Sequence, residues 1–466
     1  MKTSLIIVLV LVTLAGRADA QCTDHFILVS TSDFSTGSTS SLDPSDKTPS
    51  LNLESIHSDA VVRFGPGGLV YVVNRAGADN IQILDPCDNF NTVDQFSTGN
   101  GSGPHDIVFT SQTVAYVTRY DMTTLLKMNL QTGATLATIN LAAFADADGI
   151  PEMDQMFFAG GTLCVLLQRL DRNNFYSPVG TSYLVKIDPV TDTVIPILGG
   201  SQPVALLRTN PYSEVNLGVF QGAGIAYFSA VAFFGLTDGA VLRVDLNDPT
   251  SQAIVITESA AGGDILDVEI ISDTKGFAIV ATPSFTTELI AFNPTTGTKI
   301  GATMYAPGGY NFNDVEPSPL GLLLTDRKPT DPGIRCFDMA TNLQIPGGPV
   351  DVGLPPFDIL VNDGSPVGVG DTPSSATRLG PNYPNPFNPS TSIPFTLARE
   401  GRVTLRIYDV NGRVVATLID GAMTAGEHVA HWNASDARGL RVSSGVYMAR
   451  LETDDATDTR KLVLLK

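Results

Sequence analysis

Hydrophobic and polar residues alternate in short runs along most of the chain, and Gly, Asn, Asp and Pro separate the runs. Alternation with a period of two is typical of β-strands, whereas the 3.6-residue period of a long amphipathic helix does not recur. Glycine and proline are also frequent, at 43 and 30 of 466 residues. This pattern predicts an all-β protein.

One alternating element recurs as far as residue 363. An Asp, or once an Asn, precedes a strand-like apolar run at spacings of 44 to 62 residues. The seven positions are Asp59, Asp106, Asp154, Asn216, Asp267, Asp314 and Asp358. Repeats of about this length are typical of β-propeller blades. We therefore expect a seven-bladed β-propeller in which each of these runs is the inner strand of a blade.

A second repeated element is a turn that begins with Asp or Asn and runs in phase with the first. Its positions are Asp43, Asp85, Asn129, Asp188, Asp245, Asn293 and Asp338. Asp and Asn at such positions favour turns, and we expect each turn to join the two outer strands of a blade. The first turn precedes the first inner strand, and no turn follows the last. Residues 25–55 should therefore supply three outer strands to the blade whose inner strand is 356–361, which closes the ring.

Part of the repeat resembles a known family. The segments are "GGLVYVVNRAGADNIQILDP" (Gly67 to Pro86), "GSGPHDIVF" (Gly101 to Phe109) and "TVAYVTRY" (Thr113 to Tyr120). They resemble the YVTN-type β-propeller repeat. The resemblance implies the propeller fold and leaves the activity open.

The C-terminal part has a different pattern. Residues 364–379 are rich in Gly, Pro, Ser and Thr, which predicts a linker. Alternating runs follow, and the Asn-Gly of "DVNGRVV" (Asp409 to Val415) predicts a hairpin. We expect a two-sheet immunoglobulin-like β-sandwich of about seven strands over residues 380–466, with Trp432 in its core and the proline-rich start at its edge.

This second part also resembles a known family, through "YPNPFNPSTSIPFTL", "GRVTLRIYDVNGRVVATL", "AGEHVAHWNASDARGLRVSSGVYMARL" and "TRKLVLLK". It is similar to the FlgD-type immunoglobulin-like domain, which includes many type A C-terminal sorting domains of the type IX secretion pathway (T9SS). The resemblance implies delivery through the outer membrane or surface attachment, with a purely stabilising module as the alternative. The sorting motif would consist of Tyr383, Pro384, Asn385, Pro386, Phe387, Asn388 and Pro389.

Residues 1–20 have the pattern of a signal peptide: Lys2, an apolar run and an A-x-A site that ends at Ala20. The propeller would then span residues 21–363 of a secreted or cell-surface protein, with no transmembrane segment in the mature chain. The formal net charge of −20 argues against nucleic-acid binding. The four cysteines allow several disulfide pairings, and their spacing matches no zinc-binding motif. Cys164 lies in an apolar run, and we expect it in the core.

The repeated carboxylates are the first candidate site. Propeller symmetry should place Asp59, Asp106, Asp154, Asp267, Asp314 and Asp358 at one level near the channel mouth. Together they could hold Ca²⁺ or a cationic ligand. Alternatively, each carboxylate accepts hydrogen bonds from neighbouring backbone amides and links one blade to the next.

His57 and His105 precede the inner-strand Asp in two adjacent blades and could point toward the same mouth. Two histidines could bind a transition metal or act in acid–base catalysis, or they could be exposed loop residues. The leading interpretation is an exported bacterial binding protein without catalytic activity. Its partners would be a surface protein or glycan and, through the C-terminal domain, the secretion machinery. The alternative is a metal-assisted hydrolase or lyase with its site at the channel mouth.

Overall fold

The computed structural model describes residues 25–159, 161–195, 203–217, 224–362, 378–379, 387, 389–397, 401–409, 412–423, 426–436, 438, 440–453 and 457–465. The predicted signal peptide, Cys22, nearly all of the predicted linker, and residues 383–386 and 388 of the predicted sorting motif lie outside these ranges. Within them the chain is nearly all β, as the alternating pattern predicted.

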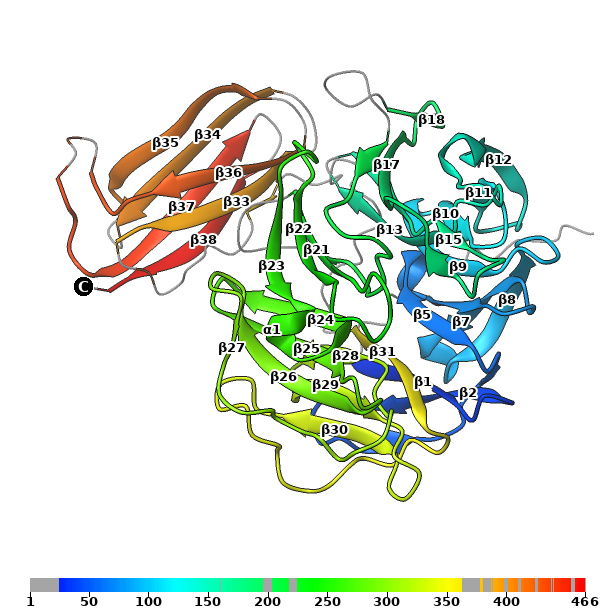
Figure 1. Cartoon of the computed structure of the whole chain (residues 1–466). Coiled ribbons are helices and arrows are strands. Elements are labelled where there is room, and N and C mark those ends of the chain that lie inside the picture. Colours follow the sequence, from blue (N-terminus) through cyan, green and yellow to red (C-terminus); the bar gives the residue numbers. More distant parts are fainter. Residues whose placement is uncertain are drawn as a thin grey trace, which may run out of the picture.

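Seven sheets stand around a common centre and form a β-propeller (Figure 1). We number the blades 1 to 7 in the order of their inner strands along the chain. From inner to outer strand, blade 1 contains β5 (Ala60–Phe64), β6 (Val70–Asn74), β7 (Asn80–Asp85) and β8 (Asn91–Ser97). Blade 2 contains β9 (Pro104–Ser111), β10 (Val114–Arg119), β11 (Thr124–Asn129) and β12 (Thr135–Asn140). Blade 3 contains β13 (Met153–Ala159), β14 (Thr162–Leu167) and β17 (Tyr183–Asp188), which pairs with both β18 (Thr193–Val194) and β19 (Val204–Ala205).

The next three blades repeat this antiparallel arrangement. Blade 4 contains β20 (Asn216–Leu217), β21 (Ile225–Ala230), β22 (Ala240–Asp245) and β23 (Gln252–Thr257). Blade 5 contains β24 (Asp264–Ser272), β25 (Lys275–Ala281), β26 (Thr287–Asn293) and β27 (Thr298–Lys299). Blade 6 contains β28 (Val315–Ser318), β29 (Gly321–Asp326) and β30 (Gly333–Phe337). The shorter elements are β15 (Leu170–Asp171), β16 (Ser177–Pro178), α1 (Glu258–Ala261) and the 3-10 turns η1 (Pro66–Gly68), η2 (Pro86–Asp88) and η3 (Ala142–Phe144).

Blade 7 is built from both ends of the propeller sequence. Its inner strand β31 (Pro356–Asn362) pairs with β1 (Phe26–Ser32), in a register that joins Phe26 to Asn362. The sheet continues through β2 (Gly37–Leu42) to β3 (Pro49–Ser50) and β4 (Ser55–Ile56). This pairing confirms the predicted closure of the ring.

The predicted turns also lie between the outer strands, because the side chain of the first residue fixes each turn. Asp85 Oδ1, for example, accepts the backbone N–H of Cys87 at 2.8 Å, and Asn129 Oδ1 accepts that of Gln131 at 2.8 Å. Equivalent bonds are made by Asp43, Asp188, Asp245, Asn293 and Asp338. These Asx turns set the register of each outer hairpin.

Hydrophobic clusters fill the space between neighbouring blades. In β1, Phe26 and Leu28 pack against blade 1, whereas Ile27 and Val29 pack against blade 6. Because successive side chains of a strand point to opposite faces, both faces of the strand are buried. Cys164 lies in such a cluster between blades 3 and 4, as predicted.

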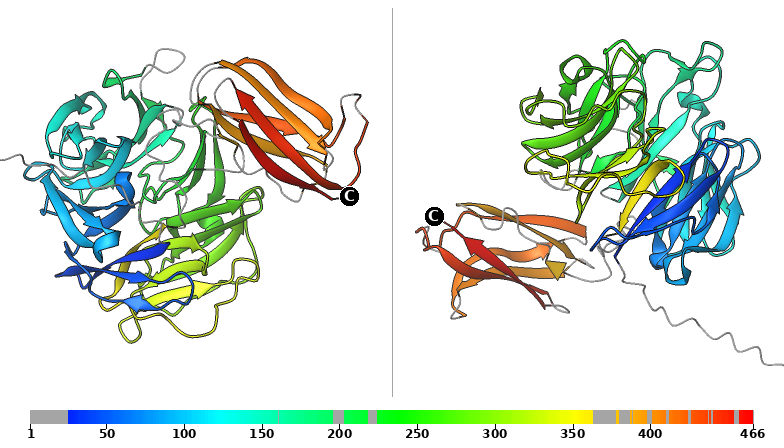
Figure 2. Two further views of the ribbon diagram at one scale, coloured as in Figure 1. Left: turned by 180° about the vertical axis from the view of Figure 1, so that it is seen from behind. Right: turned by 90° about the horizontal axis from the view of Figure 1, so that it is seen from below.

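The C-terminal part is a two-sheet sandwich (Figure 2). One sheet contains β32 (Arg378–Leu379), β33 (Thr391–Leu397) and β36 (Gly426–Trp432). The other contains β35 (Val414–Met423), β34 (Gly401–Asp409), β37 (Gly445–Thr453) and β38 (Thr457–Leu464). Trp432 is 2% exposed, and its indole N–H donates to the Ser435 carbonyl at 3.0 Å. Phe387 is buried, and its backbone N–H donates to the Val463 carbonyl at 2.9 Å, so this residue of the proline-rich start lies along β38.

Candidate functional site

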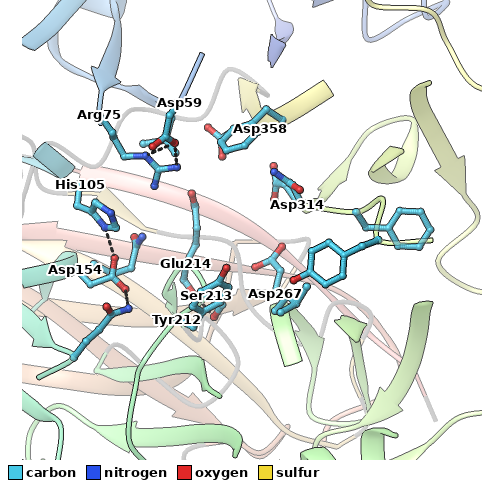
Figure 3. A pocket seen from close by; sticks show the side chains of 18 residues that line it. Asp59, Arg75, His105, Asp154, Tyr212, Ser213, Glu214, Asp267, Asp314 and Asp358 are labelled. Carbon is cyan, nitrogen blue, oxygen red and sulfur yellow. Dashed lines mark hydrogen bonds and ion pairs between the residues drawn. The ribbon is translucent and has the colours of Figure 1, made fainter. Parts of the chain in front are cut away.

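A pocket of about 350 Å³ lies at the centre of the propeller, where the inner strands begin (Figure 3). Every blade contributes at least one side chain to its wall. Asp267, Asp314 and Asp358 lie on one side, and the pairs Asp59–Arg75 and His105–Asp154 lie on the other, with Glu214 between them. The repeat therefore places most of its acidic positions around one cavity.

Four of the repeated carboxylates link neighbouring blades. In each case Oδ2 accepts a backbone N–H from the inner strand of the next blade. The pairs are Asp106 with Met156 at 2.9 Å, Asp267 with Val315 at 3.0 Å, Asp314 with Ile359 at 2.6 Å, and Asp358 with Val62 at 2.7 Å. This is the blade-linking role that the sequence offered as the alternative to ligand binding. Three of these four side chains also line the pocket.

Asp59 and Asp154 depart from this pattern. Asp59 Oδ1 accepts from Arg75 Nε at 2.9 Å. Asp154 uses one oxygen for His105 Nδ1 at 2.6 Å and the other for Gln168 Nε2 at 2.8 Å. Since the repeat symmetry is broken at these two positions, this side of the pocket differs chemically from the opposite side.

His105 is held in one orientation by several contacts. Its ring stacks on Tyr120, with 4.5 Å between ring centroids. The Tyr120 hydroxyl donates to Gln168 Oε1 at 2.6 Å, and Gln168 in turn holds Asp154. Because a carboxylate only accepts, Nδ1 of His105 carries the proton of the bond to Asp154, and Nε2 is the nitrogen that this bond leaves unused.

His57 does not join His105 in the pocket wall. Its Nδ1 accepts the backbone N–H of Asp59 at 3.1 Å, and its own backbone N–H donates to Asn74 Oδ1 at 2.8 Å. Within the part of the chain that the structure describes, no three His, Cys, Asp or Glu side chains converge on a point that could hold a metal ion. The carboxylates are spread around the ring, whereas Ca²⁺ requires six to eight oxygens at a single centre.

Arg63 and Glu214 are pocket-region residues that the repeat did not reveal. Arg63 Nε lies 3.0 Å from Asp106 Oδ1, its Nη2 lies 2.7 Å from Glu214 Oε1, and its Nη1 lies 3.9 Å from Asp358 Oδ2. One guanidinium thus joins carboxylates from three other blades. The sequence signal was an arginine that interrupts the apolar run of β5.

The acidic side of the pocket holds protons near neutral pH. Burial and the nearby Glu214 together raise the pKa of Asp267 to about 7. Burial and Glu214 likewise raise the pKa of Asp358 to about 7, although Arg63 opposes this shift. Burial, Asp358 and Asp267 raise the pKa of Asp314 well above its usual range. Glu269 and Glu316, on β24 and β28, also have raised pKa values because of burial and neighbouring carboxylates.

Comparison with known proteins supports both parts of this architecture. Residues 389–457 match the FlgD Ig-like domain family. The FlgD-type resemblance of the C-terminal segment is therefore confirmed at the level of the domain. No curated protein matches the sequence.

Several solved structures resemble the chain. A periplasmic gluconolactonase of Pseudomonas aeruginosa is 12% identical, with a TM-score of 0.51 over 72% of this chain and 98% of its own. A putative 6-phosphogluconolactonase of Bacteroides fragilis is 15% identical, with a TM-score of 0.50 over 74% and 99%. PorZ, a surface component of the type IX secretion system of Porphyromonas gingivalis, is 14% identical, with a TM-score of 0.45 over 93% of this chain and 64% of its own. The chain thus spans less than two thirds of PorZ, and at these identities the likenesses show the fold alone.

Proposed function

We propose that this chain is an exported bacterial binding protein whose propeller takes a ligand in the central pocket without converting it. The observation that carries the proposal is the construction of the pocket wall. Carboxylates that line the cavity are clamped to backbone amides of the next blade, as in the 2.7 Å bond from Val62 to Asp358. A ligand would therefore meet side chains that are already ordered, and little conformational entropy would be lost on binding.

The lining also has the composition of a ligand site. Tyr212, Tyr310, Phe312 and Phe357 give it apolar walls, and a limited set of charged groups faces the cavity. Ligand pockets generally combine aromatic walls with a few placed polar groups. The partner would be a surface protein or a glycan.

The location of the protein is part of the same proposal. The signal-peptide pattern of residues 1–20, the acidic composition and the FlgD Ig-like match support export to the cell surface or the medium. Among the described residues, no helix is long and apolar enough to cross a membrane. We propose domain limits of 21–363 for the propeller, 364–379 for the linker and 380–466 for a C-terminal domain that directs type IX secretion or surface attachment.

Ligand-observed NMR with a mixture of acidic, basic, neutral and sugar fragments tests the binding role. We expect at least one fragment class to bind the mature chain and to remain chemically unchanged over hours. The Glu214→Gln or Tyr310→Ala variant should no longer bind that fragment class. Conversion of the bound fragment would contradict the proposal, and so would binding that neither substitution weakens.

Deletion of residues 380–466 in a type IX-competent host tests the sorting role of the C-terminal domain. Unchanged arrival of the propeller at the cell surface would exclude that role.

A second candidate function is acid–base catalysis by His105. The bond to Asp154 and the stack on Tyr120 orient an imidazole that lines the pocket, which is the arrangement of a general base. A hydrolase or lyase would lose turnover by 10²-fold or more in His105→Gln, since general-base catalysis contributes about 10²–10⁴-fold. The same substitution should leave fragment binding at Tyr310 unchanged.

A further inference from the structure

Negative charge exceeds positive charge on one side of the pocket. The two arginines nearest the cavity are already engaged, Arg63 with Asp106 and Glu214, and Arg75 with Asp59. Among the ion pairs of the described residues, none includes Asp267 or Asp314. Both side chains are nonetheless at least 94% buried and line the cavity. The pocket therefore offers carboxylates that lack a cation.

Aromatic rings stand beside these carboxylates. Tyr212, Tyr310 and Phe357 all line the pocket. Guanidinium groups of the chain already lie against Phe357, with Arg75 at 5.9 Å and Arg327 at 5.5 Å from the ring centroid. Such distances are those of cation–π contacts. The wall is thus suited to a cation on an apolar stem.

Exposed aromatic residues surround the mouth of the pocket. Each inner strand begins at the pocket and the second strand returns to it, so the loops between second and third strands lie at this end. Their tips carry Phe34, Phe175, Tyr176, Phe234 and Phe285. Phe175 is 96% exposed and Phe285 is 76% exposed. We call these five residues the aromatic rim.

The backbone at the rim is strained. Phe34, Phe175 and Phe285 have φ angles of 66°, 54° and 56°. Residues other than Gly, Asn and Asp rarely adopt this left-handed backbone conformation, because it costs them free energy. The Phe34 ring lies 4.3 Å from the Arg327 guanidinium and so has a partner within the propeller. Phe175 and Phe285 present large apolar side chains to water on this strained backbone, which favours a role in contacting another molecule.

We propose that the pocket binds an arginine or lysine side chain of a protein partner, and that the aromatic rim contacts the polypeptide on either side of it. This inference deepens the proposed function and rests on it. The carboxylates of Asp267 and Asp314 would face the charged head, and Tyr212 and Tyr310 would cover the aliphatic stem. A cavity of about 350 Å³ is near the lower end of ligand sites, which suits one side chain.

Other ligand classes fit less well. An anion would meet the carboxylates directly. A hard divalent cation would need several oxygens at one point. The carboxylates of Asp267, Asp314 and Asp358 are instead each bonded to a backbone amide of a different blade.

Binding should be linked to proton release. The pKa of Asp267 is raised to about 7 by burial, so this group is partly protonated at neutral pH. A cation favours the ionised form, and the proton must therefore leave as the cation enters. Affinity should increase as pH rises from 6 to 8.

Calorimetry of the full mature chain with acetylated pentapeptides tests the inference. The probes are Gly-Gly-Arg-Gly-Gly, its citrulline counterpart, which has the same shape without the charge, and the single residue N-acetyl-arginine methylamide. We expect the arginine peptide to bind at least about tenfold more tightly than the citrulline peptide. Asp267→Asn and Tyr310→Ala should weaken binding by about fivefold or more, and Phe285→Ser should weaken only the peptide.

Asp94→Asn, on the outer strand β8, is the matched control for loss of one negative charge and should leave binding unchanged. Equal affinity for the citrulline peptide, or affinity that ignores Asp267 and Tyr310, would overturn the inference. The inference would also fail if the arginine peptide and N-acetyl-arginine methylamide bound equally well and Phe285→Ser weakened neither. In that case nothing would indicate that the arginine belongs to a polypeptide. If a different fragment class binds through Tyr310, this inference fails while the proposed binding role stands.

Discussion

The carboxylate of Asp358 accepts the backbone N–H of Val62 at 2.7 Å, across 296 residues of sequence. Asp358 lies on the last inner strand and Val62 on the first, so this bond joins blade 7 to blade 1. The bond completes the series that Asp106, Asp267 and Asp314 begin, and it lies beside the pocket. The same atoms therefore contribute to ring closure and to the shape of the candidate site.

Replacement of Asp358 should show how much its bond to the Val62 amide stabilises the closed ring. Asp358→Ala leaves the Val62 amide buried without an acceptor, which should lower the free energy of unfolding by about 1–3 kcal/mol. Asp358→Asn keeps an acceptor oxygen and resembles the protonated acid, so it should cost less than half as much. Urea unfolding measures both. Equal losses for the two variants would contradict the role of the bond.

Stability should fall as pH rises. The pKa values of Asp267 and Asp358 are about 7 in the folded protein, whereas an unfolded Asp titrates near 4. The folded state thus binds protons more tightly, and the stabilisation is complete below pH 4 and is lost as pH rises to about 7. Each unit of pKa corresponds to about 1.4 kcal/mol, so thermal melts should show a lower Tm at pH 8 than at pH 5.

The matched variant for this pH effect is Asp267→Asn, which cannot ionise but can still accept from Val315. Its Tm should change less between pH 5 and pH 8 than that of the natural chain. A pH dependence identical in both proteins would show that Asp267 does not carry the effect.

Arg63 should contribute strongly to the stability of the propeller. Arg63→Met leaves the buried Asp106 without its cation, and breaking such a pair costs about 3–5 kcal/mol. The pair with the partly exposed Glu214 should add at most about 1 kcal/mol. The loss should be smaller at pH 5, where Asp358, whose pKa is raised to about 7 mainly by burial, is protonated and carries no charge beside Arg63. Arg402→Met is the control, because Arg402 is 72% exposed and its pair with Asp420 should contribute at most about 1 kcal/mol. Equal losses in urea unfolding would contradict this assignment.

Trp432 provides a signal from the sandwich alone, since it is the single tryptophan of the chain. We expect its fluorescence transition to be insensitive to Asp267→Asn and Arg63→Met, while far-UV circular dichroism, which reports both parts, shifts. A fluorescence midpoint that moves with the propeller variants would show that the two parts unfold together.

The sequence predicted the fold well where the signal was local and repeated. Asp43 and Asn293 begin turns whose bonds lie within three residues, so the turn positions follow from composition. The closure of blade 7 followed from the phase of two repeats. Strand burial was harder to predict, because β1 buries both faces and its run Phe26 to Val29 shows no alternation.

The candidate site was only partly predictable. Asp106 and Asp154 occupy the same repeat position, yet one links blades and the other orients His105. The difference depends on partners such as Gln168 and Arg63 that other strands supply, and no local pattern reveals them. Glu214 likewise precedes a very short inner strand, β20, and faces the pocket only because blade 4 places it there.

The pairing of β1 with β31 also has a consequence for the order of synthesis and export. The first strand leaves the ribosome, and any secretion channel, more than three hundred residues before its partner. Until residue 362 arrives, the edge of β1 that will pair with β31 has no partner and the ring is open. The complete circle can therefore form only after delivery of the entire propeller segment, and a chain cut short before β31 would present that open edge to proteases and to other chains.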